Sequence, residues 1–205
     1  MAPANYRESL ENIVLVLASS SRYRHALLAR LGLPFVTDAP DVDESALPGE
    51  SAADTALRLA RAKAEAVAPR HPGRLVIGSD QVVECESARF GKPGNAAAAV
   101  SQLSTLSGRT ATFHTGLCVL DPVRREAHVA VEPFGVTFRA LSLAAIERYV
   151  ELDRPFDCAG AFRSEGLGIA LVERFVGDDP NALVGLPLIR LVTFLDRAGC
   201  SPLAR

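Results

Sequence analysis

Two short runs of apolar side chains restrict the folds open to this chain more than any other feature. Ile13-Val14-Leu15-Val16-Leu17-Ala18 and Leu75-Val76-Ile77-Gly78 are continuous and rich in branched residues. Strands buried on both faces have this pattern, whereas a strand with one wet face alternates apolar and polar residues. Hydroxyl and acidic residues follow both runs, with Ser79, Asp80 and Gln81 at the carboxyl end of the second. We therefore expect an α/β protein built on a mixed sheet.

The spacing of apolar residues predicts the remaining elements. Alternation over 110–120 and 127–139 indicates two strands joined by a turn, and a further strand is expected near 168–175. Helices are expected over 22–31, 54–67, 95–106, 142–152 and 187–198. Loops are expected over 34–50 (around one short strand), 84–92 and 177–181. Residues 1–12 form a polar tail, and no linker divides the rest, so we expect a single domain over 13–205.

The charge balance and hydropathy exclude several classes of protein. Lys and Arg total 22 against 24 Asp and Glu, which gives a formal charge of −2. Duplex-binding proteins carry a basic stripe, and single-strand binders use aromatic platforms, whereas this chain has no Trp. No stretch approaches the ~18 apolar residues of a spanning helix. The first residues lack the apolar segment of a secretion signal, so we expect a cytoplasmic protein that binds neither nucleic acid nor membranes.

The cysteines and histidines do not indicate a metal or redox centre. The four cysteines lie far apart and form no CxxC pair, which argues against a zinc knuckle or a thioredoxin-type site. We interpret them as small buried hydrophobic residues. No two of the four histidines have the spacing that a His-ligated metal needs.

A serine-rich loop precedes the first predicted helix. Ser19, Ser20 and Ser21 join the first buried strand to a helix that contains Arg22 and Arg24. Free backbone N–H groups at a helix start favour an anion, and Arg22 and Arg24 add positive charge beside it, so this loop is a candidate anion-binding site. The loop is not a P-loop, because Gly-Lys followed by Ser or Thr is absent. The alternative is that Ser21 is only a helix N-cap.

Acidic residues supply candidates for acid–base chemistry and for metal binding. Asp80 emerges from an apolar wall, where a carboxyl group is held in place and its ionisation can be tuned. Asp41, Asp43 and Glu44 crowd one loop. Together with Asp80 they offer the carboxylates that Mg²⁺ takes beside phosphate oxygens. The alternatives are a strand-end turn residue for Asp80 and a solvated acidic loop for the other three.

Two isolated lysines complete the set of candidate residues. Lys63 interrupts an Ala-rich helical face, and Lys92 lies in the rigid segment Phe90-Gly91-Lys92-Pro93. Hydroxyls, carboxylates and single cations together favour metal-assisted phosphoryl or nucleotidyl chemistry. The alternative for Lys63 is a side chain that merely reaches past the helix to water.

In order and spacing, these segments resemble the Maf family, the septum-formation inhibitor-like nucleotide pyrophosphatases. The resemblance extends from about Ile13 to Gly199. Its motifs are Leu17-Ala18-Ser19-Ser20-Ser21, Arg24, Asp41-Val42-Asp43-Glu44, Leu59-Ala60-Arg61-Ala62-Lys63-Ala64, Ile77-Gly78-Ser79-Asp80-Gln81, Gly91-Lys92-Pro93, Phe113-His114-Thr115-Gly116, Cys158-Ala159-Gly160, Glu165-Gly166, Asp179-Pro180-Asn181 and Val184-Gly185-Leu186-Pro187.

The resemblance implies a mixed, twisted sheet in two lobes, as in the Maf and inosine triphosphatase folds, with an active cleft between the lobes and commonly a homodimer. It implies hydrolysis of a nucleoside triphosphate to the monophosphate and pyrophosphate with Mg²⁺ or Mn²⁺, as a house-cleaning activity that limits modified nucleotides. The family's general base falls on Asp80. Its phosphate- and metal-binding positions fall on Ser19, Arg24, Glu44, Lys63 and Lys92, with Glu44 and Asp80 as the metal ligands. The sequence leaves open whether Asp80 removes a proton from water or orients the water through the metal.

One departure and three further positions bear on the substrate. The family usually has Pro where this chain has Arg22, and a local Arg can add phosphate-binding charge. Tyr23, Gln81 and Glu165 resemble the 7-methyl-GTP branch, in which the first of these residues is usually Trp. A cationic 7-methylguanine stacked on Tyr23 gains about 0.5–2 kcal/mol of cation–π energy, and Glu165 can accept hydrogen bonds from the guanine edge.

Two alternatives remain open at this stage. Tyr23 can instead pack inward with Leu27 while Glu165 is a solvated loop acid. The whole protein can instead be a non-catalytic nucleotide-binding regulator of cell division that acts through protein partners. The presence of Asp80, Glu44, Lys63 and Lys92 together favours catalysis, because binding alone needs cations but no strand-end carboxylate.

Overall fold

A seven-stranded mixed sheet forms the centre of the protein in the computed structural model, which describes residues 15–204. The strand order is β2-β1-β3-β5-β6-β7, and β4 pairs with β3. β1 pairs in parallel with β2 and β3, and the other pairs are antiparallel. The strands are β1 (Leu15–Ala18), β2 (Phe35–Thr37), β3 (Val76–Cys85), β4 (Ala88–Phe90), β5 (Thr110–Asp121), β6 (Glu126–Phe138) and β7 (Val172–Val176). The predicted tail over 1–12 lies outside the described residues.

The helices begin where polar caps precede apolar periodicity. The side chains of Ser21, Ser51, Asn95 and Ser142 each accept a hydrogen bond from the backbone N–H three residues on, as N-caps do. The helices are α2 (Arg22–Ala29), α3 (Ala52–Val67), α4 (Ala96–Leu106), α5 (Leu143–Asp153), α6 (Pro180–Val184) and α7 (Leu188–Arg197), with 3-10 turns at η1 (Ala68–Arg70), η2 (Ala159–Ala161) and η3 (Leu167–Leu171). The five predicted helices are thus confirmed.

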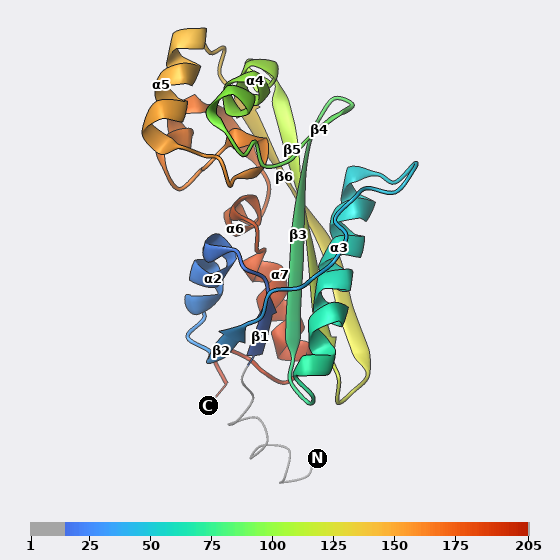
Figure 1. Ribbon diagram of the computed structural model, residues 1–205. Helices are drawn as coiled ribbons and strands as arrows, with labels where there is room; N and C mark the ends of the chain where they lie inside the picture. The colour runs from blue at the N-terminus through green and yellow to red at the C-terminus, as the bar shows by residue number, and fades with distance from the viewer. Residues whose placement is uncertain (1–14, 205) are drawn as a thin grey trace.

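The molecule is divided into two lobes along the long strands β3, β5 and β6 (Figure 1). At one end these strands pack with α4 and α5 around a core that includes Phe113 and Phe138. At the other end β1, α2 and α7 enclose a second core around Leu17 and Leu191. Helix α3 covers the opposite face of the sheet. The expected α/β fold, a mixed sheet in two lobes, is confirmed.

Two glycines bring α3 unusually close to the sheet. A Cβ added to Gly78 of β3 would lie 2.1 Å from the carbonyl oxygen of Ala60, and one added to Gly116 of β5 would lie 2.1 Å from that of Ala56. Only glycine permits such an approach of helix backbone to strand. As a result, the side chain of Lys63 on α3 reaches Asp80 on β3.

The structure corrects the predicted course of the chain in four places. The strand expected to end at Gly78 continues to Cys85, so Asp80 lies within β3 rather than beyond its end. β1 ends opposite Gly78, whereas β5 continues to pair, with Gly116 opposite Asp80. The loop expected over 84–92 contains the β3–β4 hairpin. The last strand begins at Val172, after a 3-10 turn, and the last loop runs into α6.

Within residues 15–204, none of the helices combines the length and apolar character that a membrane crossing requires.

Candidate functional site

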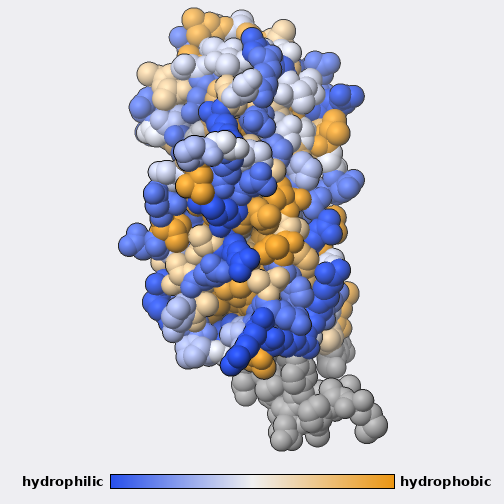
Figure 2. All heavy atoms as spheres, turned by 90° about the vertical axis from the view of Figure 1, so that its right-hand side faces the viewer, coloured by the Kyte–Doolittle hydropathy of each residue, from blue (hydrophilic) through white to orange (hydrophobic). Residues whose placement is uncertain are grey.

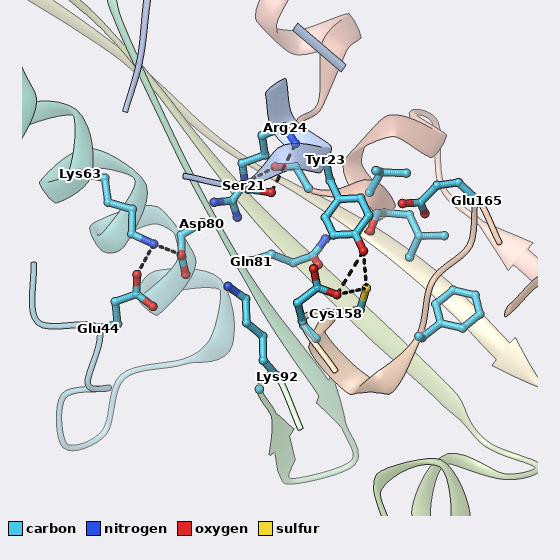
Figure 3. Close-up of a pocket in the computed structure, with 17 residues that line it drawn as sticks. Ser21, Tyr23, Arg24, Glu44, Lys63, Asp80, Gln81, Lys92, Cys158 and Glu165 are labelled. Carbon is cyan, nitrogen blue, oxygen red and sulfur yellow. Dashed lines mark hydrogen bonds and ion pairs between the residues drawn. The ribbon is translucent and has the colours of Figure 1, made fainter. Parts of the chain in front are cut away.

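A cavity of about 340 Å³ lies between the two lobes, a volume in the range of small-molecule sites (Figure 3). The site residues predicted from the sequence line it, with the exception of Ser19, Asp41 and Asp43. The lining residues are Ser21, Tyr23, Arg24, Glu44, Lys63, Asp80, Gln81, Gly91, Lys92, Asp157, Cys158, Ala159, Phe162, Glu165, Leu183, Val184 and Gly185. Residues from distant parts of the sequence thus meet in one cleft.

Lys63 lies at the centre of the charged end of the cavity. Its Nζ is 2.5 Å from Asp80 Oδ1 and 2.5 Å from Glu44 Oε1. Lys63 and Asp80 are buried, with 5% and 8% of their surface exposed, whereas the side chain of Glu44 is 62% exposed. The alternative in which Lys63 merely reaches past its helix to water is therefore wrong. The ammonium group holds two carboxylates together.

The ionisation of Glu44 reflects these neighbours. Partial burial opposes the charged form, but the hydrogen bond and charge of Lys63 outweigh it, helped by Lys92 and Arg24. The pKa of Glu44 is therefore below its usual value, and the carboxylate is charged at neutral pH. A charged Glu44 is available to a cation in the cleft.

The start of α2 presents hydrogen-bond donors to the cavity. Ser21 Oγ accepts from the backbone N–H of Arg24 at 3.4 Å, so Ser21 is an N-cap that also lines the cavity. Ser19 is buried, and its Oγ accepts from the N–H of Ser21 at 3.1 Å. Ser19 therefore shapes the loop without reaching the cavity. The N–H groups of the first helical turn have no partner within the helix, which favours an anion at this end.

Arg24 is held against the backbone of a later segment. Its Nε donates to the carbonyl oxygen of Gly185 at 2.8 Å, and the buried Ser79 donates to the same oxygen at 3.0 Å. Burial lowers the pKa of Arg24, while the charges of Asp80 and Glu44 oppose that change. A guanidinium stays charged in proteins, so Arg24 contributes a fixed cation beside the two carboxylates.

Lys92 approaches from the other lobe and is exposed. It follows β4 in the segment Gly91-Lys92, and both residues line the cavity. Its ammonium group makes no hydrogen bond or ion pair with any residue in the described part of the chain. Lys92 is therefore free to bind a ligand anion.

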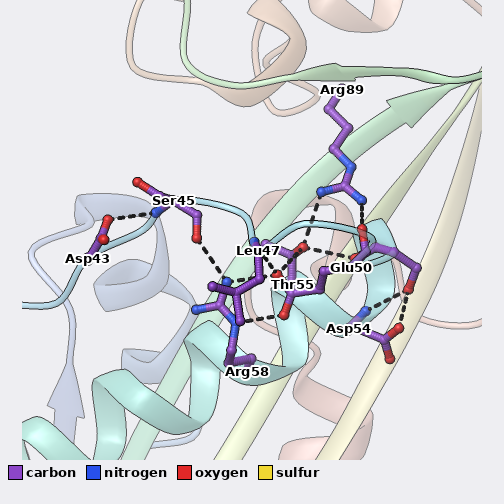
Figure 4. Close-up of polar contacts among 9 residues, drawn as sticks. Asp43, Ser45, Leu47, Glu50, Asp54, Thr55, Arg58 and Arg89 are labelled. Carbon is purple, nitrogen blue, oxygen red and sulfur yellow. Dashed lines mark hydrogen bonds and ion pairs between the residues drawn. The ribbon is translucent and has the colours of Figure 1, made fainter.

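A separate group of polar contacts fixes the loop that carries Glu44 (Figure 4). Arg58 on α3 binds the carboxylate of Glu50 with both Nε and Nη2, at 2.6 and 2.8 Å. The same Nη2 donates to the carbonyl oxygen of Ser45 at 3.0 Å. Paired contacts of this kind are geometrically specific. Arg58 thus fastens both ends of segment 45–50 to the helix that carries Lys63.

Arg89 connects this loop to the β3–β4 hairpin. Its Nη1 lies 3.3 Å from Thr55 Oγ1, and its Nη2 donates to the carbonyl oxygen of Glu50. Arg89 lies three residues before Lys92. The contact therefore relates the segment that bears Glu44 to the segment that bears Lys92.

Tyr23 forms one wall at the other end of the cavity. Its hydroxyl donates to Asp157 Oδ1 at 3.1 Å and accepts from Arg22 Nη2 at 2.7 Å. Burial, followed by the contact with Cys158, raises the pKa of Tyr23 to about 12. The alternative in which Tyr23 packs inward is wrong, because its ring lines the cavity. Arg22 contacts Tyr23 and Asp157 and does not line the cavity.

Gln81 and Glu165 lie at the same end of the cavity as Tyr23. Gln81 is held by several hydrogen bonds, whereas Glu165 is exposed. Gln81 Nε2 donates to the carbonyl oxygens of Ala182 and Leu183, at 2.9 and 3.1 Å, and lies 2.9 Å from Thr115 Oγ1. Its amide nitrogen therefore fixes α6. Glu165 is exposed and, among the described residues, accepts a hydrogen bond only from the adjacent Ser164, at 3.0 Å. Its carboxylate is available to a ligand.

Sequence reasoning missed part of the wall. Asp157 belongs to no recognisable motif, and Phe162 lines the cavity while remaining 5% exposed. Cys158 was assigned to the core, whereas it is half-buried and lines the cavity. Burial, above all, raises its pKa to about 11, so the thiol is protonated at neutral pH.

The charges of the lining define what the cavity can hold. Arg24, Lys63 and Lys92 face the four carboxylates of Glu44, Asp80, Asp157 and Glu165. This lining cannot by itself neutralise a polyphosphate. Within residues 15–204, no group of three His, Cys, Asp or Glu residues is arranged to hold a metal ion.

Comparison with known proteins gives a consistent result. A family model described as "Maf-like protein" matches residues 14–198. The 7-methyl-GTP pyrophosphatase of Nitrosococcus oceani is 54% identical over 185 residues, which are 90% of this chain and 93% of that protein. The 7-methyl-GTP pyrophosphatase of Pseudomonas aeruginosa is 51% identical over 90% of this chain and 96% of its own.

Among solved structures, the Ham1 protein of Staphylococcus aureus aligns with 62% of this chain and 72% of its own, at 18% identity and a TM-score of 0.43.

Proposed function

This chain belongs to the Maf family, and from that premise we propose that it hydrolyses 7-methyl-GTP to 7-methyl-GMP and pyrophosphate. The observation that carries the proposal is the buried Lys63–Asp80 pair at one end of a cleft whose other end is aromatic. A non-catalytic regulator would need cations for binding, but no buried carboxylate beside them. Nothing in the cleft or among the relatives favours that alternative.

In the proposed reaction a water molecule attacks the α-phosphorus. The new bond joins the water oxygen to phosphorus, and the bond to the bridging oxygen breaks, so that pyrophosphate leaves with the electron pair. Asp80 accepts a proton from the water. Lys63 Nζ, at 2.5 Å from Asp80 Oδ1, holds the Asp80 side chain in place. General bases placed in this way contribute about 10²–10⁴-fold to the rate.

The surrounding cations bind the triphosphate. Lys92 makes no ion pair within residues 15–204 and lines the cavity from the opposite lobe, so we assign it to the pyrophosphate group. Arg24 and the first turn of α2, capped by Ser21, supply charge and N–H donors on the other side. Charged donors placed where negative charge develops lower the barrier.

Glu44 and Asp80 fit a divalent cation, because oxygens of both carboxylates lie 2.5 Å from one ammonium nitrogen. Mg²⁺ takes one or two protein carboxylates and completes its shell with water and phosphate oxygens, which agrees with the small donor set. When bound, Mg²⁺ or Mn²⁺ supplies positive charge to the phosphate oxygens. The four carboxylates of the lining outnumber its three cations, so the binding of a triphosphate also requires the positive charge of a metal ion.

Tyr23 and Glu165 are assigned to the nucleobase. The ring of Tyr23 offers a stacking face for the cationic 7-methylguanine. The free carboxylate of Glu165 can accept hydrogen bonds from guanine N1–H and the 2-amino group. Gln81 is assigned a supporting role, since its amide nitrogen holds α6 in place.

A homodimer in the cytoplasm completes the proposal. Residues 126–134 of β6 pair with β5 on one side, and β7 reaches only residues 135–138 on the other. Val129 on this edge is exposed, and apolar side chains gather on the face of the molecule where α3 and β6 lie (Figure 2). An open edge with apolar side chains favours pairing with another copy. Light scattering should therefore give the mass of a dimer, and Val129→Lys should favour the monomer.

Asp80→Asn tests the catalytic assignment. The amide keeps the shape of the side chain but neither accepts a proton nor binds Mg²⁺ as well. We expect a folded protein whose kcat for 7-methyl-GTP is at least ~10²-fold lower. A folded variant with near-wild-type turnover would remove Asp80 from the reaction.

A further inference from the structure

The nucleobase end of the cavity is spanned by a bridge between the two lobes. We define the cross-cleft bridge as Arg22, Tyr23 and Asp157. Tyr23 Oη lies 3.1 Å from Asp157 Oδ1, and Arg22 Nη2 lies 2.7 Å from Tyr23 Oη and 3.2 Å from Asp157 Oδ2. Two of these residues belong to the first turn of α2, and Asp157 follows α5 in the other lobe. The bridge therefore joins parts of the chain that are 134 positions apart.

The bridge fixes the orientation of an aromatic ring. Tyr23 Oη also lies 3.5 Å from Cys158 Sγ, and the guanidinium carbon of Arg22 lies 4.8 Å from the ring centroid. Because the pKa of Tyr23 is raised to about 12, the phenol keeps its proton at neutral pH and can donate it to Asp157. Contacts with three groups at one oxygen leave the ring little freedom to turn. The same ring lines the cavity, as the close-up shows (Figure 3).

The bridge is also connected to the phosphate end. Backbone hydrogen bonds of 3.0 and 3.2 Å join segment 156–160 to segment 91–94. The first segment contains Asp157 and the second contains Lys92. Arg24 follows Tyr23 directly on α2. The bridge therefore ties the helix that carries Arg24 to the segment attached to Lys92.

We propose that Asp157 is a positioning residue for base recognition, which acts by holding the Tyr23 hydroxyl from the opposite lobe. This inference rests on the proposed function, because it deepens the assignment of Tyr23 to the base. Without the bridge the ring turns and stacks less well, while the phosphate contacts persist. The loss of stacking weakens the binding of 7-methylguanine more than that of guanine, because the positive charge of 7-methylguanine adds a cation–π contribution to stacking.

The test compares Asp157→Ala, Tyr23→Phe and the double variant. Calorimetry measures the binding of 7-methyl-GMP, GMP and pyrophosphate, and kinetics measure KM and kcat for 7-methyl-GTP. The net effect of one hydrogen bond corresponds to about 2–12-fold. We expect either single variant to weaken 7-methyl-GMP binding about fivefold, to weaken GMP binding less, and to change KM more than kcat. The double variant should resemble the single ones, because all three remove the same contact.

Two matched variants separate positioning from general disruption. Asp157→Asn keeps an oxygen that accepts from Tyr23, so it should restore most of the affinity for 7-methyl-GMP. Glu151→Ala removes an equally exposed ion pair with Arg148, on α5 and outside the cavity, and should leave all binding unchanged. Thermal unfolding of each variant confirms that it is folded.

Three results would overturn the inference: additive losses in the double variant, equal weakening of pyrophosphate binding, or unchanged 7-methyl-GMP binding in Asp157→Ala. The binding measurements also distinguish this inference from the proposed function. If the wild-type protein binds 7-methyl-GMP but hydrolyses no nucleotide, the proposed function is refuted. The affinities of the variants for 7-methyl-GMP then still test the role of Asp157. A wild-type protein that binds no nucleotide refutes both.

Discussion

Replacement of Lys63 by Met should destabilise the protein, because the buried side chain of Asp80 loses the cation beside it. Met has a similar length and suits an apolar helix face. Asp80 has only 11% of its side chain exposed and would lose its cation, and breaking a buried pair costs about 3–5 kcal/mol. The side chain of Glu44 is 62% exposed and can turn to water, so the loss of its contact with Lys63 adds little to the destabilisation. We therefore expect the free energy of unfolding to fall by about 3 kcal/mol at neutral pH.

The same variant should recover as the pH falls. In the wild type the pKa of Glu44 is depressed by Lys63, so its contribution to stability is present above the usual Glu range and is lost as the pH falls through that range. Met at position 63 makes no such contact, so the variant has no such contribution to lose. We expect the deficit of the variant to be smaller at about pH 4.5 than at pH 7.

Urea unfolding at the two pH values measures both deficits. Arg61→Met is the matched control, because Arg61 lies on the same helix in an exposed i,i+4 pair with Glu65. That variant should change the stability by less than about 0.5 kcal/mol at either pH. A Lys63→Met deficit below about 1 kcal/mol at pH 7, or one that grows on acidification, would refute the reasoning.

Two further variants probe the groups around this pair. The hydrogen bonds from Arg58 lower the pKa of Glu50 to about 2, so its stabilising effect is present above the usual Glu range and is lost between about pH 4.5 and pH 2. Glu50→Gln should therefore flatten the pH dependence of stability in that window, and an unchanged acid-unfolding curve would contradict this assignment. Lys92→Ala should raise KM for 7-methyl-GTP about tenfold, the effect of one charge-assisted hydrogen bond, while the thermal midpoint stays within about 1 °C because the side chain is exposed. An unchanged KM would leave Lys92 without a role.

The fold was predictable where local chemistry and packing agree. The apolar run ending at Ala18 and the cap at Ser21 place a strand and a helix, and both were found. Asp80 shows where the prediction failed. The three apolar residues before Gly78 marked only the part of β3 beside β1, whereas the remainder pairs with β5 and β4. The pairing with β5 depends on a strand about 30 to 40 residues away, so local periodicity does not reveal it.

The candidate site likewise has a part that the sequence predicted and a part that it did not. Lys63, Asp80 and Glu44 were predicted because motifs surround them, and the close approach at Gly78 and Gly116 brings them together. Asp157 was not predicted, although it directly precedes the motif Cys158-Ala159-Gly160, because no pattern in the sequence indicates a role for it. Its importance comes only from the position of Tyr23 across the cleft. Contacts between lobes are a property of the tertiary structure, and a single sequence carries little record of them.

The central claim is that this cleft hydrolyses a methylated guanine nucleotide to release pyrophosphate. The most direct test measures pyrophosphate release by the wild-type protein from 7-methyl-GTP, GTP, UTP and dTTP in the presence of Mg²⁺. The stacking face of Tyr23 and the carboxylate of Glu165 predict the highest kcat/KM for 7-methyl-GTP, a lower value for GTP, and the lowest values for UTP and dTTP. Equal hydrolysis of dTTP and 7-methyl-GTP would contradict the assigned base recognition, and no pyrophosphate from any of the four would contradict the account as a whole.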